Sequence, residues 1–175
     1  MRTKNKTIAL ILMLAILFTL IPADTQAATV PAKVTKALGK AVDENGRAIV
    51  VDQSNERIYL FKRDCKTHEW KLKKTGRCIV SQKLSKTKHY MLLRNDDVDT
   101  LLWGTARDRW SYGMVIDCYE KPAYIVLHSY REHYTGRTWV KDKSRAGNDF
   151  GIAVCEGLAE YIWKHYTDGT AVMGV

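Results

Sequence analysis

The chain has 175 residues, of which 46% are hydrophobic and 27% charged, and its formal net charge is +9. This length fits one domain that can bury a sizeable core. The basic residues are scattered, with the densest group at Lys71, Lys73 and Lys74, a pattern typical of a solvated face and not of a nucleic-acid-binding surface. The positive charge suits an anionic surrounding such as a cell wall or a membrane surface.

The N-terminal residues 1–27 have the pattern of a secretory signal peptide. Three basic residues precede an apolar run from Ile8 to Ile21, which is shorter than the roughly 20 residues that a membrane-spanning helix needs. Thr25 and Ala27 supply the small side chains that signal peptidase requires, so we expect cleavage after Ala27. Cleavage removes three basic residues and one acidic residue, which lowers the charge from +9 to +7. We expect a secreted or cell-envelope protein with no stable membrane span after cleavage; an uncleaved anchor helix is the alternative.

A polar, weakly patterned tail at residues 28–46 precedes a domain at residues 47–175. Short β-type runs occupy the domain, and the last of them is nearly all apolar, which favours a central position in a sheet. The first two runs surround a polar turn and predict a β-hairpin, and the next two predict another. The predicted strands are Arg47–Asp52, Arg57–Lys62, His68–Lys73, Arg77–Ser81, Tyr112–Asp117 and Ala123–Ser129.

One segment has clear helical spacing. Leu158, Ile162 and Tyr166 recur at four-residue intervals between Glu156 and Tyr166. A turn follows, and Thr170–Val175 is predicted to be the closing strand. These elements predict a mainly β domain, largely antiparallel, with one helix near the C-terminus.

The four cysteines are compatible with disulfides in an oxidising compartment, in three possible pairings. Cys65 and Cys78 flank the second predicted hairpin, and we favour that pair over those with Cys118 or Cys155. Their spacing suits neither a CxxC redox motif nor a zinc site. The acidic cluster at residues 96–99 lacks the spaced ligands of a calcium loop, so we predict a solvated turn there. No cofactor and no metal are predicted.

Three segments carry a resemblance to a known family. They are the hairpin Ile49–Phe61, the strand Tyr124–Ser129 and the helix and strand within Ala159–Met173. In this order they resemble the L,D-transpeptidase catalytic domain (YkuD type) of bacterial cell-wall enzymes. The resemblance implies a β-sandwich or barrel with a helix near the C-terminus, and a location in the cell wall.

The resemblance also implies a chemistry. In that family a cysteine in the signature Ser/Thr-x-Gly-Cys-x-Arg, activated by a histidine, attacks a carbonyl of a peptidoglycan stem peptide, and an amine from a neighbouring stem resolves the acyl-enzyme. Carbapenem-type β-lactams acylate active members. His128 lies in the matched strand, but the aligned signature is changed throughout, with Asn148 at the serine, Phe150 at the glycine, Gly151 at the cysteine and Ala153 at the arginine. Glycine has no side chain to acylate.

The leading hypothesis is therefore an L,D-transpeptidase-like protein that lacks the catalytic cysteine and binds peptidoglycan without turnover. It predicts that Gly151 faces His128 across a shallow cleft, with Cys155 behind it, buried or disulfide-bonded. One alternative is an active transpeptidase that uses Cys155 with His128. Another is a non-enzymatic binder of anionic wall polymers. The expected partners are peptidoglycan stem peptides or another anionic cell-wall polymer.

Overall fold

The computed structural model describes residues 29–93, 103–104, 107–118, 125–148 and 151–175. The segment from Ala32 to Val175 forms one compact unit. The predicted signal peptide and the acidic cluster at residues 96–99 lie outside the described residues. In the part of the chain that is described, no helix reaches the length and hydropathy that a membrane crossing requires.

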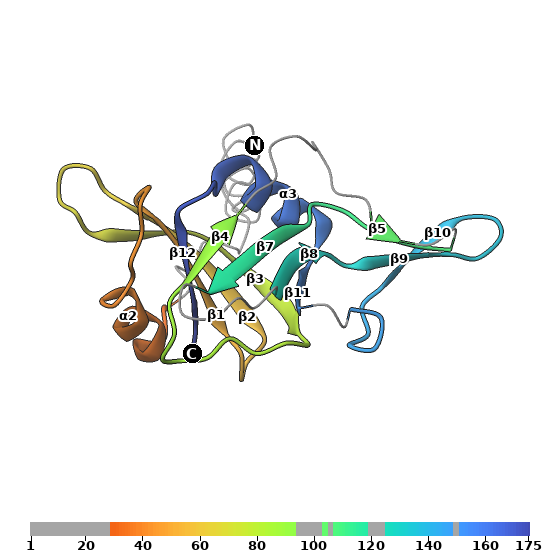
Figure 1. Ribbon diagram of the computed structural model, residues 1–175, viewed down its shortest axis with the longest axis horizontal. Helices are drawn as coiled ribbons and strands as arrows, with labels where there is room; N and C mark the ends of the chain where they lie inside the picture. Colours follow the sequence, from red (N-terminus) through yellow and green to blue (C-terminus); the bar gives the residue numbers. More distant parts are fainter. Residues whose placement is uncertain (1–28, 94–102, 105–106, 119–124, 149–150) are drawn as a thin grey trace, which may run out of the picture. The chain divides into compact units, whose positions relative to one another are not determined.

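Eight strands close into a barrel, as the mainly β prediction anticipated (Figure 1). Around the barrel the strand order is β1-β12-β4-β7-β8-β11-β3-β2. Two neighbouring pairs, β1 with β12 and β8 with β11, are parallel, and the other pairs are antiparallel. The strand bounds are β1 Arg47–Asp52, β2 Arg57–Arg63, β3 Trp70–Val80, β4 Tyr90–Leu93, β7 Met114–Cys118, β8 Ile125–Ser129, β11 Gly151–Val154 and β12 Thr170–Gly174.

Alternate residues of these strands fill the core, as the two-residue period of a strand requires. Ile49, Leu60, Ile116 and Leu127 are fully buried in one apolar cluster. The predicted helix is present as α3, Glu156–His165, and its apolar face joins this cluster. The hairpin of β1 and β2 and the closing strand β12 are also confirmed.

The tail at residues 28–46 contains a helix that its weak pattern did not predict. Helix α2, Ala32–Leu38, buries Val34 and Leu38, and two large apolar side chains in seven residues give little periodicity to detect. Lys33 connects the helix to the first hairpin through an ion pair of 2.6 Å with the fully buried Asp52. Burial alone raises the pKa of Asp52, but hydrogen bonds from Lys33, Asn55 and Ser54 together hold it well below its usual range. Asp52 therefore stays charged and keeps Lys33 in place.

The second predicted hairpin is wrong, because His68–Lys73 and Arg77–Ser81 fall largely on one continuous strand, β3. Its first part pairs with β2 and its end pairs with β11. Cys65 lies in the turn before β3 and Cys78 near its far end. At the usual strand rise, eight residues of β3 alone span about 26 Å, well beyond the reach of a disulfide. Both cysteines are free, so the favoured pairing is also wrong.

A second, four-stranded sheet has the order β10-β9-β6-β5 and was not predicted. Its strands are short, and the residues of β6, β9 and β10 are mostly half-buried or exposed, so no run of apolar residues marks them. Its strands are joined by backbone pairing, and charged side chains add contacts between them, since Arg131 forms ion pairs with both Asp108 and Asp142. In Figure 1, β5, β9 and β10 lie on the opposite side of the barrel from α2. The bounds are β5 Trp103–Gly104, β6 Asp108–Trp110, β9 Arg131–Tyr134 and β10 Trp139–Asp142.

Candidate functional site

His128 lies on β8, a strand paired on both sides by β7 and β11. Its side chain is only 1% exposed, and its Nδ1 lies 2.6 Å from the carbonyl oxygen of Ser129. A carbonyl oxygen only accepts hydrogen bonds, so Nδ1 carries the hydrogen and donates it. Nε2 is then the basic nitrogen of the ring, the atom through which a histidine takes a proton from a nucleophile. The strand therefore holds the ring in the tautomer of a general base.

The register between β8 and β11 decides which residue lies beside His128. The two strands run parallel, with Ala153 paired to His128 and Gly151 paired to Val126. The residue aligned with the signature arginine therefore lies next to the histidine. Gly151 begins β11 two residues earlier, where it pairs with Val126. That Gly151 faces His128 across a shallow cleft stays a prediction. The parallel register depends on how the two strands meet in the barrel, and neither strand's own sequence encodes it.

The backbone around Gly151 leaves no room for a side chain. A Cβ atom built there would lie 2.3 Å from the carbonyl oxygen of Val126 and 2.7 Å from its nitrogen. It would also lie 3.1 Å from Cγ2 of Ile125. The first two contacts are with main-chain atoms of the neighbouring strand, so rotation of a side chain cannot relieve them. In this arrangement β11 accepts only glycine at the position that aligns with the nucleophile.

Cys155 lies one residue beyond β11, where it precedes the first turn of α3. Its carbonyl oxygen accepts hydrogen bonds from the backbone nitrogens of Leu158 and Ala159, both at 2.9 Å. The side chain is exposed and the thiol is free, so the expectation of a buried or disulfide-bonded cysteine is wrong. The reason is local, since strand pairing ends at Val154 and the next residue turns outward to start the helix. Cys155 is thus open to solvent, whereas His128 is buried.

The other thiols are less suited to nucleophilic chemistry. Burial raises the pKa of the Cys78 thiol to about 12, and the nearby charges of Glu56 and Asp52 add to this. A thiol with so high a pKa stays protonated at neutral pH and is a poor nucleophile. Cys118 is likewise buried, and Cys65 is exposed in a turn far along the chain from β8.

Asn148, aligned with the signature serine, is fully buried and joins three parts of the structure. Its amide nitrogen donates to the carbonyl oxygens of Asp142 and Ser144, at 2.9 and 2.7 Å. Its side-chain oxygen accepts from the backbone nitrogen of Arg131 at 2.8 Å, and its carbonyl oxygen accepts from the hydroxyl of Ser81 at 2.6 Å. These bonds connect β9, the loop after β10 and the end of β3. No sequence pattern indicated this role, because Arg131 and Ser81 are 17 and 67 residues away from Asn148 along the chain.

We expect Asn148→Ala to destabilise the protein by about 3 kcal/mol, because it removes three hydrogen bonds of a buried side chain at about 1 kcal/mol each. Urea unfolding followed by circular dichroism measures this change. Ser144→Ala is the matched control in the same loop. It removes an exposed hydroxyl, which accepts from the nitrogen of Gly147 at 3.2 Å and also bonds to the carboxylate of Asp142, and should cost about 1 kcal/mol. Equal midpoints for the two variants would contradict the structural role of Asn148.

A surface depression borders β8 where the strand ends. Ser129 contributes its hydroxyl, which accepts from the backbone nitrogen of Ser111 at 2.9 Å. Lys141 of β10 and Glu156 of α3 form an exposed ion pair of 2.6 Å across it. The depression has no interior volume that would hold a water molecule; its lining residues are Ser111, Ser129, Tyr130, Glu132, Lys141 and Glu156. Among the described residues, no group of His, Cys, Asp or Glu side chains is arranged to hold a metal ion.

Comparison with known proteins gives structural likenesses only. No family model and no curated protein matches the chain. A fused Zn-dependent amidase/peptidase/peptidoglycan-binding domain-containing protein from Clostridium acetobutylicum aligns with a TM-score of 0.51 at 17% identity, over 91% of this chain and 72% of that one. The helical cell shape determining protein Pgp2 from Campylobacter jejuni aligns with a TM-score of 0.46 at 9% identity, over 81% of this chain and 53% of that one.

A third solved structure is the Ldtfm-avibactam carbamoyl enzyme, with a TM-score of 0.42 at 17% identity, over 75% of this chain and 49% of that one. The chain thus spans about half the length of the last two proteins. At such identities a likeness shows the fold alone. The chain shares its mainly β fold with a protein named for a peptidoglycan-binding domain.

Proposed function

We propose that this chain is an exported L,D-transpeptidase-like protein of the cell wall that binds peptidoglycan stem peptides without turning them over. The observation that carries the proposal is the main chain of Val126, which fills the space of a side chain at Gly151. Beside it, His128 is buried and oriented as a base, with no thiol at the aligned position to activate. The matched segments occur in the order that the resemblance requires: the β1–β2 hairpin, β8, and then α3 with β12.

The chemistry of acyl transfer supports the absence of turnover. A thiolate beside a basic imidazole attacks a carbonyl carbon, and the acyl-enzyme then reacts with an amine. At a comparable acyl-transfer site, removal of the nucleophile costs on the order of a million-fold in turnover. Binding depends on partly different residues, so a fold that has lost its nucleophile can keep affinity for the substrate.

The Lys141–Glu156 pair is the best placed group to bind a stem peptide. It lies in the depression next to Ser129, whose carbonyl orients His128. A stem peptide presents both amines and carboxylates, and an exposed pair of opposite charges can bond to each. Residues 1–27 fit this proposal, since a signal peptide would deliver the domain to the cell envelope.

Sedimentation with insoluble peptidoglycan tests the proposal. We expect the purified chain to sediment with peptidoglycan, and the charge-neutral double variant Lys141→Gln with Glu156→Gln to sediment several-fold less. The matched control is Lys164→Gln with Glu160→Gln, which removes another exposed ion pair of 2.6 Å from α3. This control should sediment like the unmodified chain. Failure of the unmodified chain to sediment, or equal losses in both double variants, would reject binding at this depression.

A further inference from the structure

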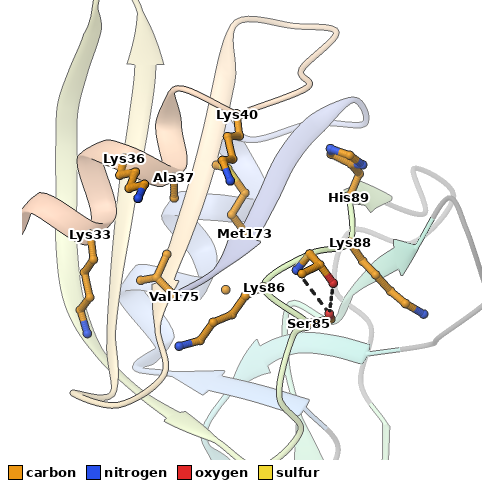
Figure 2. A pocket seen from close by; sticks show the side chains of 12 residues that line it. Lys33, Lys36, Ala37, Lys40, Ser85, Lys86, Lys88, His89, Met173 and Val175 are labelled. Carbon is orange, nitrogen blue, oxygen red and sulfur yellow. Dashed lines mark hydrogen bonds between the residues drawn. The ribbon is translucent and has the colours of Figure 1, made fainter.

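A cavity of about 560 Å³ lies between α2, the loop that joins β3 to β4, and the end of β12 (Figure 2). This volume falls within the range of about 300–1,000 Å³ that is usual for small-molecule sites. Neither aspartate nor glutamate side chains are among its described lining residues. Its basic lining residues are Lys33, Lys36, Lys40, Lys86, Lys88 and His89. The cavity is therefore strongly positive.

Both basic walls are fixed in place by buried contacts. Helix α2 is anchored by Val34 and by the bond from Lys33 to Asp52. The loop is anchored by Leu84, which is 2% exposed. The backbone nitrogen of Leu84 donates to Oε1 of Gln53 at 2.7 Å, and its carbonyl oxygen accepts from Nε2 of Gln53 at 3.0 Å. The lysines thus project from a preformed frame and not from a free terminus.

Among the described residues, three of these lysines lack an ion-pair partner. Lys36, Lys40 and Lys86 form no ion pair within the described residues, whereas Lys33 is engaged by Asp52. Figure 2 shows Lys36 and Lys40 on the helix side, and Lys86 extending from the loop past Val175. Like charges gathered around one cavity repel each other, and an anion bound between them would remove that cost.

The choice of side chains indicates the kind of anion. No arginine is among the described residues that line the cavity. Arginine is the residue that binds a carboxylate in a bidentate geometry. Lysine acts as a point charge and is a common ligand for phosphate. We propose that this cavity binds a ligand that carries two or more phosphate groups, held between α2 and the β3–β4 loop. The site is built from other elements than β8 and β11, so it does not depend on the proposed function of the His128 region.

Isothermal titration of the purified chain at fixed ionic strength tests the inference with three probes. Inorganic tripolyphosphate represents a soluble phosphate ligand, a glycerol phosphate oligomer represents a phosphodiester polymer, and oligoglutamate represents a carboxylate polymer. We expect saturable binding of tripolyphosphate or the glycerol phosphate oligomer with one site per chain, and the tighter of the two identifies the source of the ligand. Equal or tighter binding of oligoglutamate would overturn the assignment to phosphate.

The triple variant Lys36→Gln, Lys40→Gln and Lys86→Gln should weaken phosphate binding by at least about tenfold, since each lysine loses a charge-assisted bond. The matched control changes Lys62, Lys66 and Lys73 to Gln. These are exposed lysines outside the cavity, and the control alters the net charge by the same amount. Its affinity should stay within about twofold of the unmodified chain. Equal weakening in both triple variants would show attraction to net charge alone and would overturn the site, as would the absence of saturable binding.

Discussion

The purified chain should remain covalently unmodified after incubation with a carbapenem. Active members of the family that it resembles are acylated on their cysteine, whereas the aligned position here is Gly151, which has no reactive atom. Intact-protein mass spectrometry decides the result, because one acyl adduct adds the whole mass of the drug. The expected spectrum shows the unmodified mass at drug concentrations and times that fully label an active transpeptidase run in parallel.

Two exposed cysteines provide the control for this experiment. Cys155 and Cys65 are both free and exposed, but only Cys155 lies at the end of β11. If an adduct forms slowly and its amount decreases equally in Cys155→Ser and Cys65→Ser, it reflects ordinary thiol reactivity. An adduct abolished by Cys155→Ser and by His128→Ala, but kept in Cys65→Ser, would reject the proposal. It would establish the alternative, an active enzyme that uses Cys155 with His128.

Gly151→Ala should destabilise the protein by about 3 kcal/mol, near the upper end of what overpacking usually costs. The added Cβ would meet main-chain atoms of Val126, so β11 and β8 must separate to accommodate it. For a domain of this size the loss corresponds to a fall in Tm of about 10 °C. Gly151→Cys should behave similarly, which would prevent a simple substitution from restoring a nucleophile. Thermal unfolding followed by circular dichroism measures both variants.

Gly157→Ala is the matched control, because it makes the same chemical change six residues later. A Cβ at Gly157 meets nothing within 4 Å, and the residue lies in α3. Alanine is favoured over glycine in a helix, so this variant should gain up to about 1 kcal/mol. If Gly151→Ala proved as stable as Gly157→Ala, the close approach of β11 to Val126 would be wrong, and the proposal would lose its main support.

Local patterns in the sequence determined those elements whose own residues show a clear apolar periodicity. Alternating or continuous apolar runs gave the β1–β2 hairpin and the buried strand β8, and the four-residue spacing of Leu158 and Ile162 gave α3. The mainly β fold followed from these runs. Elements with a weak pattern were missed: α2 has only two buried apolar residues, and the second sheet carries charged side chains such as Arg131 and Asp142 in place of apolar runs.

The sequence predicted only part of the candidate site. His128 was identified from its strand, but its tautomer follows from the carbonyl of Ser129, which a sequence does not display. The buried network of Asn148 and the cavity with Lys36 and Lys86 both join segments that are far apart along the chain. No short-range pattern encodes such contacts.

Strand continuity and register were decided by the tertiary structure alone. The run that read as two strands around Thr75 is one strand, because β2 and then β11 supply partners along its whole length. That pairing separates Cys65 from Cys78 and leaves both thiols free. The sequence by itself determined that residue 151, which the resemblance aligns with the nucleophile, is glycine. Only the closed barrel decided that Val126 occupies the space of its side chain, because backbone approach between parallel strands depends on how the whole barrel closes.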